Sequence, residues 1–160
     1  MSEPDGKGKS FDALKLGSQL CFPLYAAARE TVKKYTPYLS ELGLTYTQYI
    51  VMMVLWEEKS VSAKRLGERL LLDSGTLTPL LKTLEKRGLL SRSRDGEDER
   101  YLRLVITDAG SALRERAVRI PEKIAGCMPL DPAEAAELYR LLYKILNGRG
   151  SGERAELPAE

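Results

Sequence analysis

Histidine is absent from this sequence of 160 residues, and only two cysteines are present, Cys21 and Cys127. The absence of histidine removes the commonest general base and the commonest metal ligand, together with any Ser/His or Cys/His pair. We therefore expect no metal, no cofactor and no enzymatic activity. Because a permanent disulfide is rare in a reducing cytoplasm, we expect both cysteines to be thiols, either inert or reactive.

Long apolar runs are also absent, since no stretch approaches the roughly 20 residues that cross a bilayer. Residues 1–10 are polar and lack the apolar centre of a secretory signal. These features predict a cytoplasmic protein without a membrane partner. We interpret residues 1–10 and 148–160 as flexible tails around a single domain over residues 11–147.

Positive charge is concentrated in one part of a chain whose net charge is only +2. Residues 62–94 contain eight basic and three acidic side chains, which leaves the remaining sequence with a net charge of −3. Such a local basic surface is typical of phosphate binding. A solvated face with a chance excess of basic residues is the alternative.

The apolar spacing predicts helices over most of the chain. A first helix is expected over about residues 11–35, ended by Thr36-Pro37, with Pro23 either interrupting it or close to its true start. A second is expected from Thr45 or Thr47 to Glu58, and its apolar residues point nearly all round, as in a core helix.

Two short helices joined by a tight turn follow. Ser62 is a good N-cap for a helix over residues 63–70, and residues 71–75 form the connection. The next helix runs to Arg87 and is stopped by Gly88, although Pro79 allows it to begin as late as Thr76. This arrangement predicts a helix-turn-helix.

A β-hairpin is expected next, from residues 90–94 and 101–106, which flank an acidic turn and alternate apolar with polar side chains. Thr107-Asp108 then caps a helix that is interrupted around Pro121 and ends near Met128, and Asp131 begins the last helix. The predicted fold is mainly α with a small β-hairpin, a winged helix-turn-helix.

Polar and basic side chains of the second helix and the hairpin are the candidate contacts to double-stranded DNA. They are Ser74, Thr76, Thr78, Lys82, Lys86, Arg92 and Arg94. A small α/β core with exposed Lys and Arg for solubility is the alternative interpretation.

Three segments carry a resemblance to a known family: residues 71–82 (Leu-Leu-Asp-Ser-Gly-Thr-Leu-Thr-Pro-Leu-Leu-Lys), Asp98-Glu99-Arg100, and Thr107-Asp108-Ala109-Gly110. They resemble the MarR family of repressors, and within it the organic-hydroperoxide sensors of the OhrR type. The resemblance covers about residues 14–146.

The resemblance implies a homodimer formed through the N- and C-terminal helices, about residues 11–44 and 108–147, around a DNA-binding lobe of about residues 45–107. Two recognition helices would then meet a pseudo-palindromic operator with half-sites about one helical turn apart. The resemblance also implies that Asp98 and Arg100 stabilise the hairpin, with Arg94 as the tip that contacts DNA.

The same resemblance implies a redox function for the thiols. Cys21 matches the peroxide-reactive cysteine, Tyr35 and Tyr46 match two tyrosines of the partner subunit that support its thiolate, and Tyr25 matches a third. Organic hydroperoxide would then be the inducer. Cys127 is interpreted as the resolving cysteine, although an external low-molecular-weight thiol could replace it.

Two other functions stay open from the sequence. In the first, a MarR-type repressor is released by a non-covalent phenolic ligand, in a pocket lined by Tyr25, Tyr35, Met52 and Trp56. In the second, the chain is a thiol peroxidase. The second is disfavoured because the sequence carries no Cys-x-x-Cys and no recognisable activating base.

Overall fold

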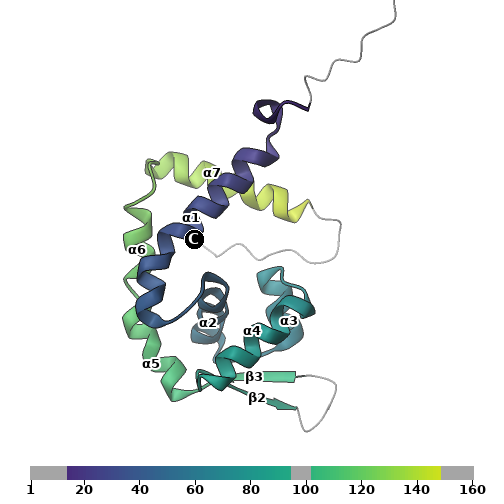
Figure 1. Ribbon diagram of the computed structural model, residues 1–160, viewed down its shortest axis with the longest axis vertical. Helices are drawn as coiled ribbons and strands as arrows, with labels where there is room; N and C mark the ends of the chain where they lie inside the picture. Colours follow the sequence, from purple (N-terminus) through teal and green to yellow (C-terminus); the bar gives the residue numbers. More distant parts are fainter. Residues whose placement is uncertain (1–13, 95–101, 149–160) are drawn as a thin grey trace, which may run out of the picture.

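A computed structural model of the chain describes residues 14–94 and 102–148. Within these residues a short 3-10 turn (Leu16–Ser18) precedes seven α-helices and three strands. They are α1 (Cys21–Leu42), α2 (Tyr46–Glu58), β1 (Ser60–Ser62), α3 (Ala63–Leu70), α4 (Ser74–Lys86), β2 (Leu90–Arg94), β3 (Leu102–Ile106), α5 (Asp108–Ala117), α6 (Ile120–Ala125) and α7 (Pro132–Asn147). The predicted winged helix-turn-helix, mainly helical with a small sheet, is confirmed (Figure 1).

The first helix lies further along the sequence than the predicted residues 11–35. It begins at Cys21, so Pro23 falls in its first turn, where no helical N–H is required. The prediction that Thr36-Pro37 ends the helix is wrong, because α1 continues to Leu42. Pro37 is exposed, and water can therefore satisfy the carbonyl that its ring leaves unpaired.

Side-chain caps set the start of each of the next three helices. The Thr45 side chain accepts from the backbone N–H of Gln48, whose own side chain accepts from Thr45, which makes a capping box for α2. Ser62 caps α3 as expected. Asp73 caps α4, which therefore begins at Ser74, earlier than the latest start allowed from the sequence.

The three strands form one antiparallel sheet in the order β1-β3-β2. The predicted hairpin is the pair β2 and β3, in which Arg92 faces Leu104 across the register. The edge strand β1 was not predicted, since a three-residue strand shows little alternation. It pairs Val61 with Leu104 on the other side of β3.

One hydrophobic core lies between α2, α3, α4 and the sheet, and it includes residues from α1, α5 and α6. Trp56 of α2 is buried in it and donates from Nε1 to the carbonyl of Gly110, 2.8 Å away, at the start of α5. The last turn of α1 reaches the same core through Leu39 and Leu42.

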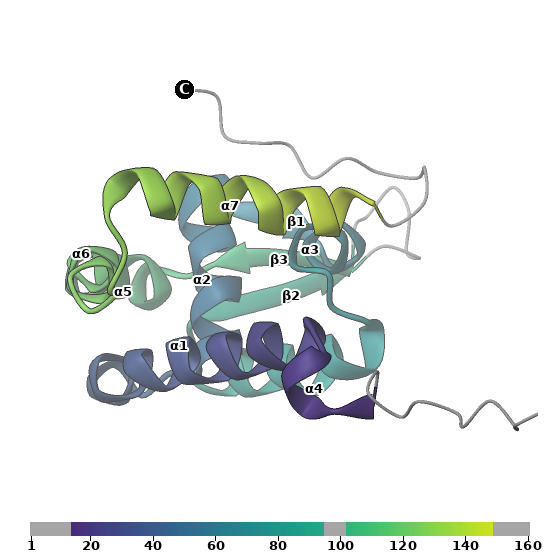
Figure 2. The ribbon, with the colours of Figure 1, turned by 90° about the horizontal axis from the view of Figure 1, so that it is seen from above.

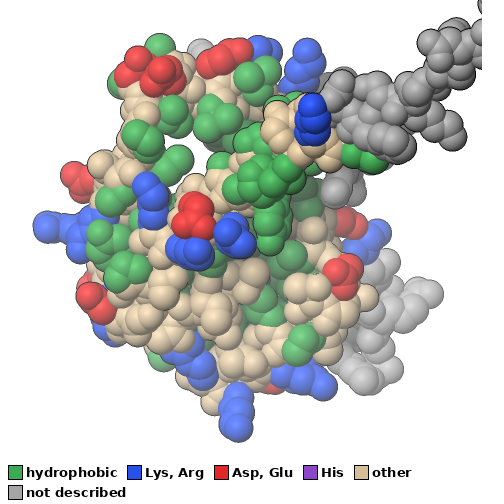
Figure 3. All heavy atoms as spheres, turned by 45° about the horizontal axis from the view of Figure 1, so that its top comes forward, with side chains coloured by type: hydrophobic (Ala, Val, Ile, Leu, Met, Phe, Trp, Pro, Cys, Tyr) green, Lys and Arg blue, Asp and Glu red, His purple; other side chains and the backbone are tan. Residues whose placement is uncertain are grey.

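The N-terminal half of α1 and the whole of α7 extend away from this core (Figure 1), and seen from above they lie in front of it (Figure 2). Neither contributes a buried residue, although both carry large apolar side chains, and Figure 3 shows green side chains gathered over this part of the molecule. The exposed side chains are Leu20, just before α1, then Phe22, Leu24 and Tyr25 of α1, and Leu138, Tyr139, Leu141, Ile145 and Leu146 of α7. No helix in the described ranges is long and apolar enough to cross a membrane.

Candidate DNA interface and thiol site

The outward face of α4 carries most of the predicted DNA contacts. Leu77, Leu81 and Leu84 are buried against the core, and so the remaining faces of the helix turn to solvent. Ser74, Thr76, Thr78, Lys82 and Lys86 are all exposed there. Ser74, Thr78, Lys82 and Lys86 follow one another at intervals of four residues and so share one free helix face, which suits insertion into a major groove.

The two threonines are already engaged within α4. The Thr76 hydroxyl donates to Oδ2 of Asp73 at 2.9 Å, and the Thr78 hydroxyl donates to the carbonyl of Ser74 at 2.7 Å. A hydroxyl has a single hydrogen, so in this arrangement both oxygens can only accept further hydrogen bonds. They are suited to base amino groups rather than to phosphate oxygens.

Arg92 does not present a free guanidinium to DNA. Its Nε lies 2.7 Å from Oε2 of Glu85 in α4, and a second nitrogen of the guanidinium also contacts this oxygen. The hydrogen bond from Arg92 lowers the pKa of Glu85. This pair joins the wing, which is the β2–β3 hairpin, to α4. The DNA contact expected of Arg92 stays a prediction. The side chain of Arg94, and Asp98 and Arg100, lie outside the described residues.

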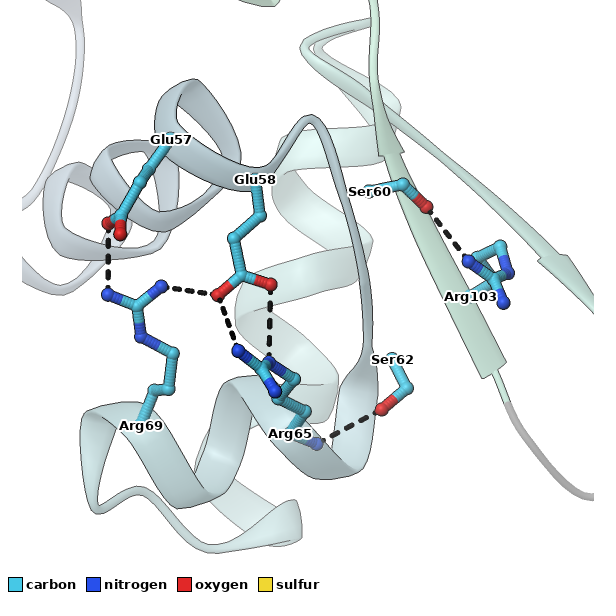
Figure 4. A network of polar contacts seen from close by, with 7 residues as sticks. All are labelled: Glu57, Glu58, Ser60, Ser62, Arg65, Arg69 and Arg103. Carbon is cyan, nitrogen blue, oxygen red and sulfur yellow. Dashed lines mark hydrogen bonds and ion pairs between the residues drawn. The ribbon is translucent and has the colours of Figure 1, made fainter. Parts of the chain in front are cut away.

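A second charged network fastens α3 to the end of α2 (Figure 4). Arg69 lies 2.9 Å from Glu57 and also contacts Glu58, while Arg65 pairs with Glu58 at 3.3 Å. These two arginines belong to the basic stretch of residues 62–94. Because acidic partners pair with these two arginines at the surface, the net positive charge available to DNA is smaller than the sequence suggests.

Cys21 is exposed at the first position of α1, within the apolar surface described above. Tyr25 follows one turn later, also exposed, with the Arg29 guanidinium 5.6 Å from its ring centroid. Tyr35 lies 14 residues from Cys21 along the same helix, which corresponds to about 21 Å. The two cannot be in contact within one chain.

Tyr35 and Tyr46 lie side by side, while their expected role at the partner's thiol stays a prediction. The rings of Tyr35 and Tyr46 meet edge to face with centroids 4.9 Å apart, and Tyr49 lies 5.9 Å from Tyr35. Tyr49 was missed, although its i, i+3 spacing from Tyr46 places both on one helix face. Burial raises the pKa of Tyr35 and the pKa of Tyr46. Burial, together with the nearby Tyr35 and Tyr46, raises the pKa of Tyr49 to about 12. All three hydroxyls are therefore protonated donors at neutral pH.

A hollow of about 300 Å³ lies beside this tyrosine cluster, between α1 and the start of α2. It is lined by Val32, Thr36, Leu39, Ser40, Leu44, Thr45 and Tyr46. The predicted ligand pocket is corrected here, because Met52 and Trp56 are buried in the core and Tyr25 lies near the far end of α1.

Cys127 is exposed just after α6, and its carbonyl accepts from Nζ of Lys34 at 2.6 Å. Lys34 lies 13 residues after Cys21 on α1, or about 20 Å along the helix. A disulfide requires Cα atoms within about 7 Å. Cys21 and Cys127 of the same chain therefore cannot be joined in this arrangement. Among the described residues no cluster of acidic and cysteine side chains could hold a metal.

Comparison with known proteins places this architecture in a family of transcription factors. Residues 33–116 match the family model described as transcriptional regulator SarA/Rot. The organic hydroperoxide resistance transcriptional regulator of Bacillus subtilis is 46% identical over 136 residues, covering 85% of this chain and 92% of that protein. The chain belongs to the MarR-type family of winged-helix transcriptional regulators, which includes both. It is a regulator and not an enzyme.

Two solved structures extend the comparison. AbfR of Staphylococcus epidermidis, in its reduced form bound to DNA, is 36% identical with a TM-score of 0.71 and covers 84% of this chain and 94% of its own. AbfR is also known overoxidised on DNA and with a disulfide formed. BpsR of Bordetella bronchiseptica, whose DNA binding is regulated by 6-hydroxynicotinic acid, is 26% identical with a TM-score of 0.77, covering 84% and 97% of the two chains.

Proposed function

We propose that this chain is a homodimeric transcriptional repressor that releases its operator when an organic hydroperoxide oxidises Cys21. The position of Cys21 carries the proposal. It is exposed in an apolar surface that its own chain does not cover, and it is about 21 Å from a tyrosine that a second chain could supply.

The dimer is supported by the exposed apolar side chains of α1 and α7. Phe22, Leu138 and Ile145 are 44%, 40% and 55% exposed. Apolar patches of this kind on a soluble protein mark interaction surfaces. A two-fold pairing of α1 and α7 would bury them and present two α4 helices to successive major grooves of a pseudo-palindromic site.

In such a dimer the hydroxyls of Tyr35 and Tyr46 of one chain stabilise the Cys21 thiolate of the other by hydrogen bonding, with Tyr25 nearby. The thiolate attacks the terminal peroxide oxygen, the O–O bond breaks, and the electron pair leaves on the alkoxide. The alkoxide takes a proton from solvent and departs as alcohol, which leaves Cys21 as a sulfenic acid.

Cys127 of the opposite chain then attacks the sulfenic sulfur, forming a disulfide and releasing water. AbfR binds DNA in both its reduced and its overoxidised form, so oxidation of sulfur alone is compatible with DNA binding in that relative. We therefore assign operator release to the disulfide, which pulls on α1 and on the segment after α6.

The test is a DNA-binding titration on the sequence upstream of the protein's own gene, before and after one equivalent of cumene hydroperoxide and after dithiothreitol. Wild type should lose the DNA on oxidation and regain it on reduction. Cys21→Ser should bind DNA and ignore peroxide. Cys127→Ser should be oxidised but stay bound, whereas its release would transfer the second step to an external thiol.

The hollow beside Tyr46 supports a second candidate, a repressor released by a small non-covalent phenolic ligand. The DNA binding of BpsR is regulated by a small hydroxylated aromatic acid, 6-hydroxynicotinic acid. The two functions differ in one readout. If Cys21→Ser keeps the full response to the natural inducer, the redox function fails and the non-covalent one stands.

A further inference from the structure

The C-terminal end of α1 is held by arginines from two other elements. Its Leu39 and Ser40 carbonyls accept from the backbone N–H groups of Leu44 and Gly43, at 2.9 and 3.0 Å. The next three carbonyls, those of residues 41, 42 and 43, accept from guanidinium groups. Every carbonyl of this helix end therefore has a donor, and the last three donors come from outside α1.

Arg87 supplies two of these bonds. Its Nη2 lies 3.1 Å from the carbonyl of Leu42, and its Nη1 contacts the carbonyl of Gly43. Arg116 of α5 takes the remaining carbonyl, that of Glu41, at 2.7 Å. A cation at these carbonyls is also favoured by the negative end of the α1 helix dipole.

Gly43 allows the close approach of Arg87 because it has no side chain. A Cβ at this position would lie 2.9 Å from Nη2 of Arg87, and the backbone has a φ of 65°, where side chains are rarely tolerated. The guanidinium thus occupies space that a side chain would fill. Substitution of the glycine would disturb the contact from the α1 side without removing the arginine.

The contact of Arg87 joins α4 to α1, two helices with different proposed functions. Arg87 is the C-cap residue of α4, the proposed recognition helix, and α1 carries Cys21 at its other end. The basic side chains Arg65, Arg69 and Arg92 pair with carboxylates of the same lobe. Arg87 instead reaches out of the lobe to α1, so a displacement of α1 acts on the end of α4 through this contact.

We propose that Arg87 is a positioning residue that couples α1 to the recognition helix, so that strain on α1 after oxidation of Cys21 reorients α4. The inference rests on the proposed redox function. In thermodynamic terms, Arg87 carries part of the coupling between the oxidation state of the thiols and the affinity for DNA.

The experiment measures operator affinity by fluorescence anisotropy for the reduced and the peroxide-treated protein, and takes the ratio of the two dissociation constants. Arg87→Gln should lose thiol at the wild-type rate, yet its ratio should fall by about tenfold, the range typical of such coupling. Arg116→Gln is the matched control, because it frees the same helix end from α5 and leaves α4 attached. It should keep the wild-type ratio.

Gly43→Ala provides a second variant that keeps Arg87 and should lower the ratio in the same direction. An unchanged ratio in both Arg87→Gln and Gly43→Ala would show that Arg87 only caps α1. That result would overturn the inference and leave the proposed redox function standing. Equal losses in Arg87→Gln and Arg116→Gln would also overturn it, since the coupling would not run through α4. If wild type itself keeps its DNA after oxidation, the proposed function fails and the inference with it.

Discussion

Nε of Arg92 in strand β2 lies 2.7 Å from Oε2 of Glu85 in helix α4, so a charged pair joins the wing to the recognition helix. The lobe therefore contains two kinds of basic residue, those that pair with a carboxylate of the lobe and those that are exposed on α4. Arg92 is occupied and three-quarters covered, with 25% of its side chain exposed, whereas Lys82 and Lys86 stand exposed on the free face of α4.

This difference predicts different salt dependences of DNA binding. Lys82→Gln should remove a proposed phosphate contact and lower the slope of log affinity against log salt concentration by about one. Arg92→Gln should weaken binding with the wild-type slope, because it loosens the wing without removing a phosphate contact. Anisotropy titrations from low to high salt measure both slopes, and a reduced slope in Arg92→Gln would instead make Arg92 a direct phosphate contact.

A close approach between two backbones predicts a stability difference between two glycines. A Cβ on Gly110 would lie 2.1 Å from the Leu89 carbonyl, so Gly110→Ala must displace α5 from the lobe and should lower the free energy of unfolding by about 3 kcal/mol. Gly126→Ala is the control. Its Cβ would meet its nearest atoms at 3.7 Å, and with helical φ it should stabilise the fold by about 0.5 kcal/mol. Urea unfolding measures both values.

The raised pKa of Tyr49 predicts a loss of stability in alkali. Burial, reinforced by Tyr35 and Tyr46, lifts this pKa from about 10 in the unfolded chain to about 12. Between these values the unfolded state loses its proton before the folded state does, so stability is full below pH 10 and falls as the pH rises towards 12. Tyr49→Phe should reduce this decline by about 2 kcal/mol in urea unfolding at pH 9 and 11.5. An equal decline in the variant would contradict the assignment.

The tyrosine cluster also predicts the rate of thiol oxidation. Tyr35→Phe and Tyr46→Phe each remove a hydroxyl that donates to the Cys21 thiolate across the proposed dimer, and each should slow reaction with cumene hydroperoxide by about tenfold. Tyr38→Phe is the matched control, since Tyr38 packs under Lys123 with its ring centroid 4.9 Å from Nζ. Stopped-flow or timed thiol assays give the rates, and wild-type rates in both variants would exclude the tyrosines from the chemistry.

Much of the site could be derived from local patterns. The caps Ser62 and Thr107, the stop at Gly88 and the leucine stripe of α4 are visible in the sequence, because capping and periodicity are local properties. The motif of residues 71–82 correctly identified the family. The extent of α1 was not predictable in this way, because buried Leu39 and Leu42 stabilise a last turn that Pro37 alone would interrupt.

The sequence by itself determined the order of the elements, the turn chemistry between them and the residue types available for DNA and peroxide. Only the tertiary structure decided which charges are free. Arg92 pairs with Glu85, 7 residues away in the sequence. Arg87 donates to the carbonyl of Leu42 at the end of α1, 45 residues away. Such pairings follow from how helices and strands pack, and a residue's own neighbours in the sequence do not encode them.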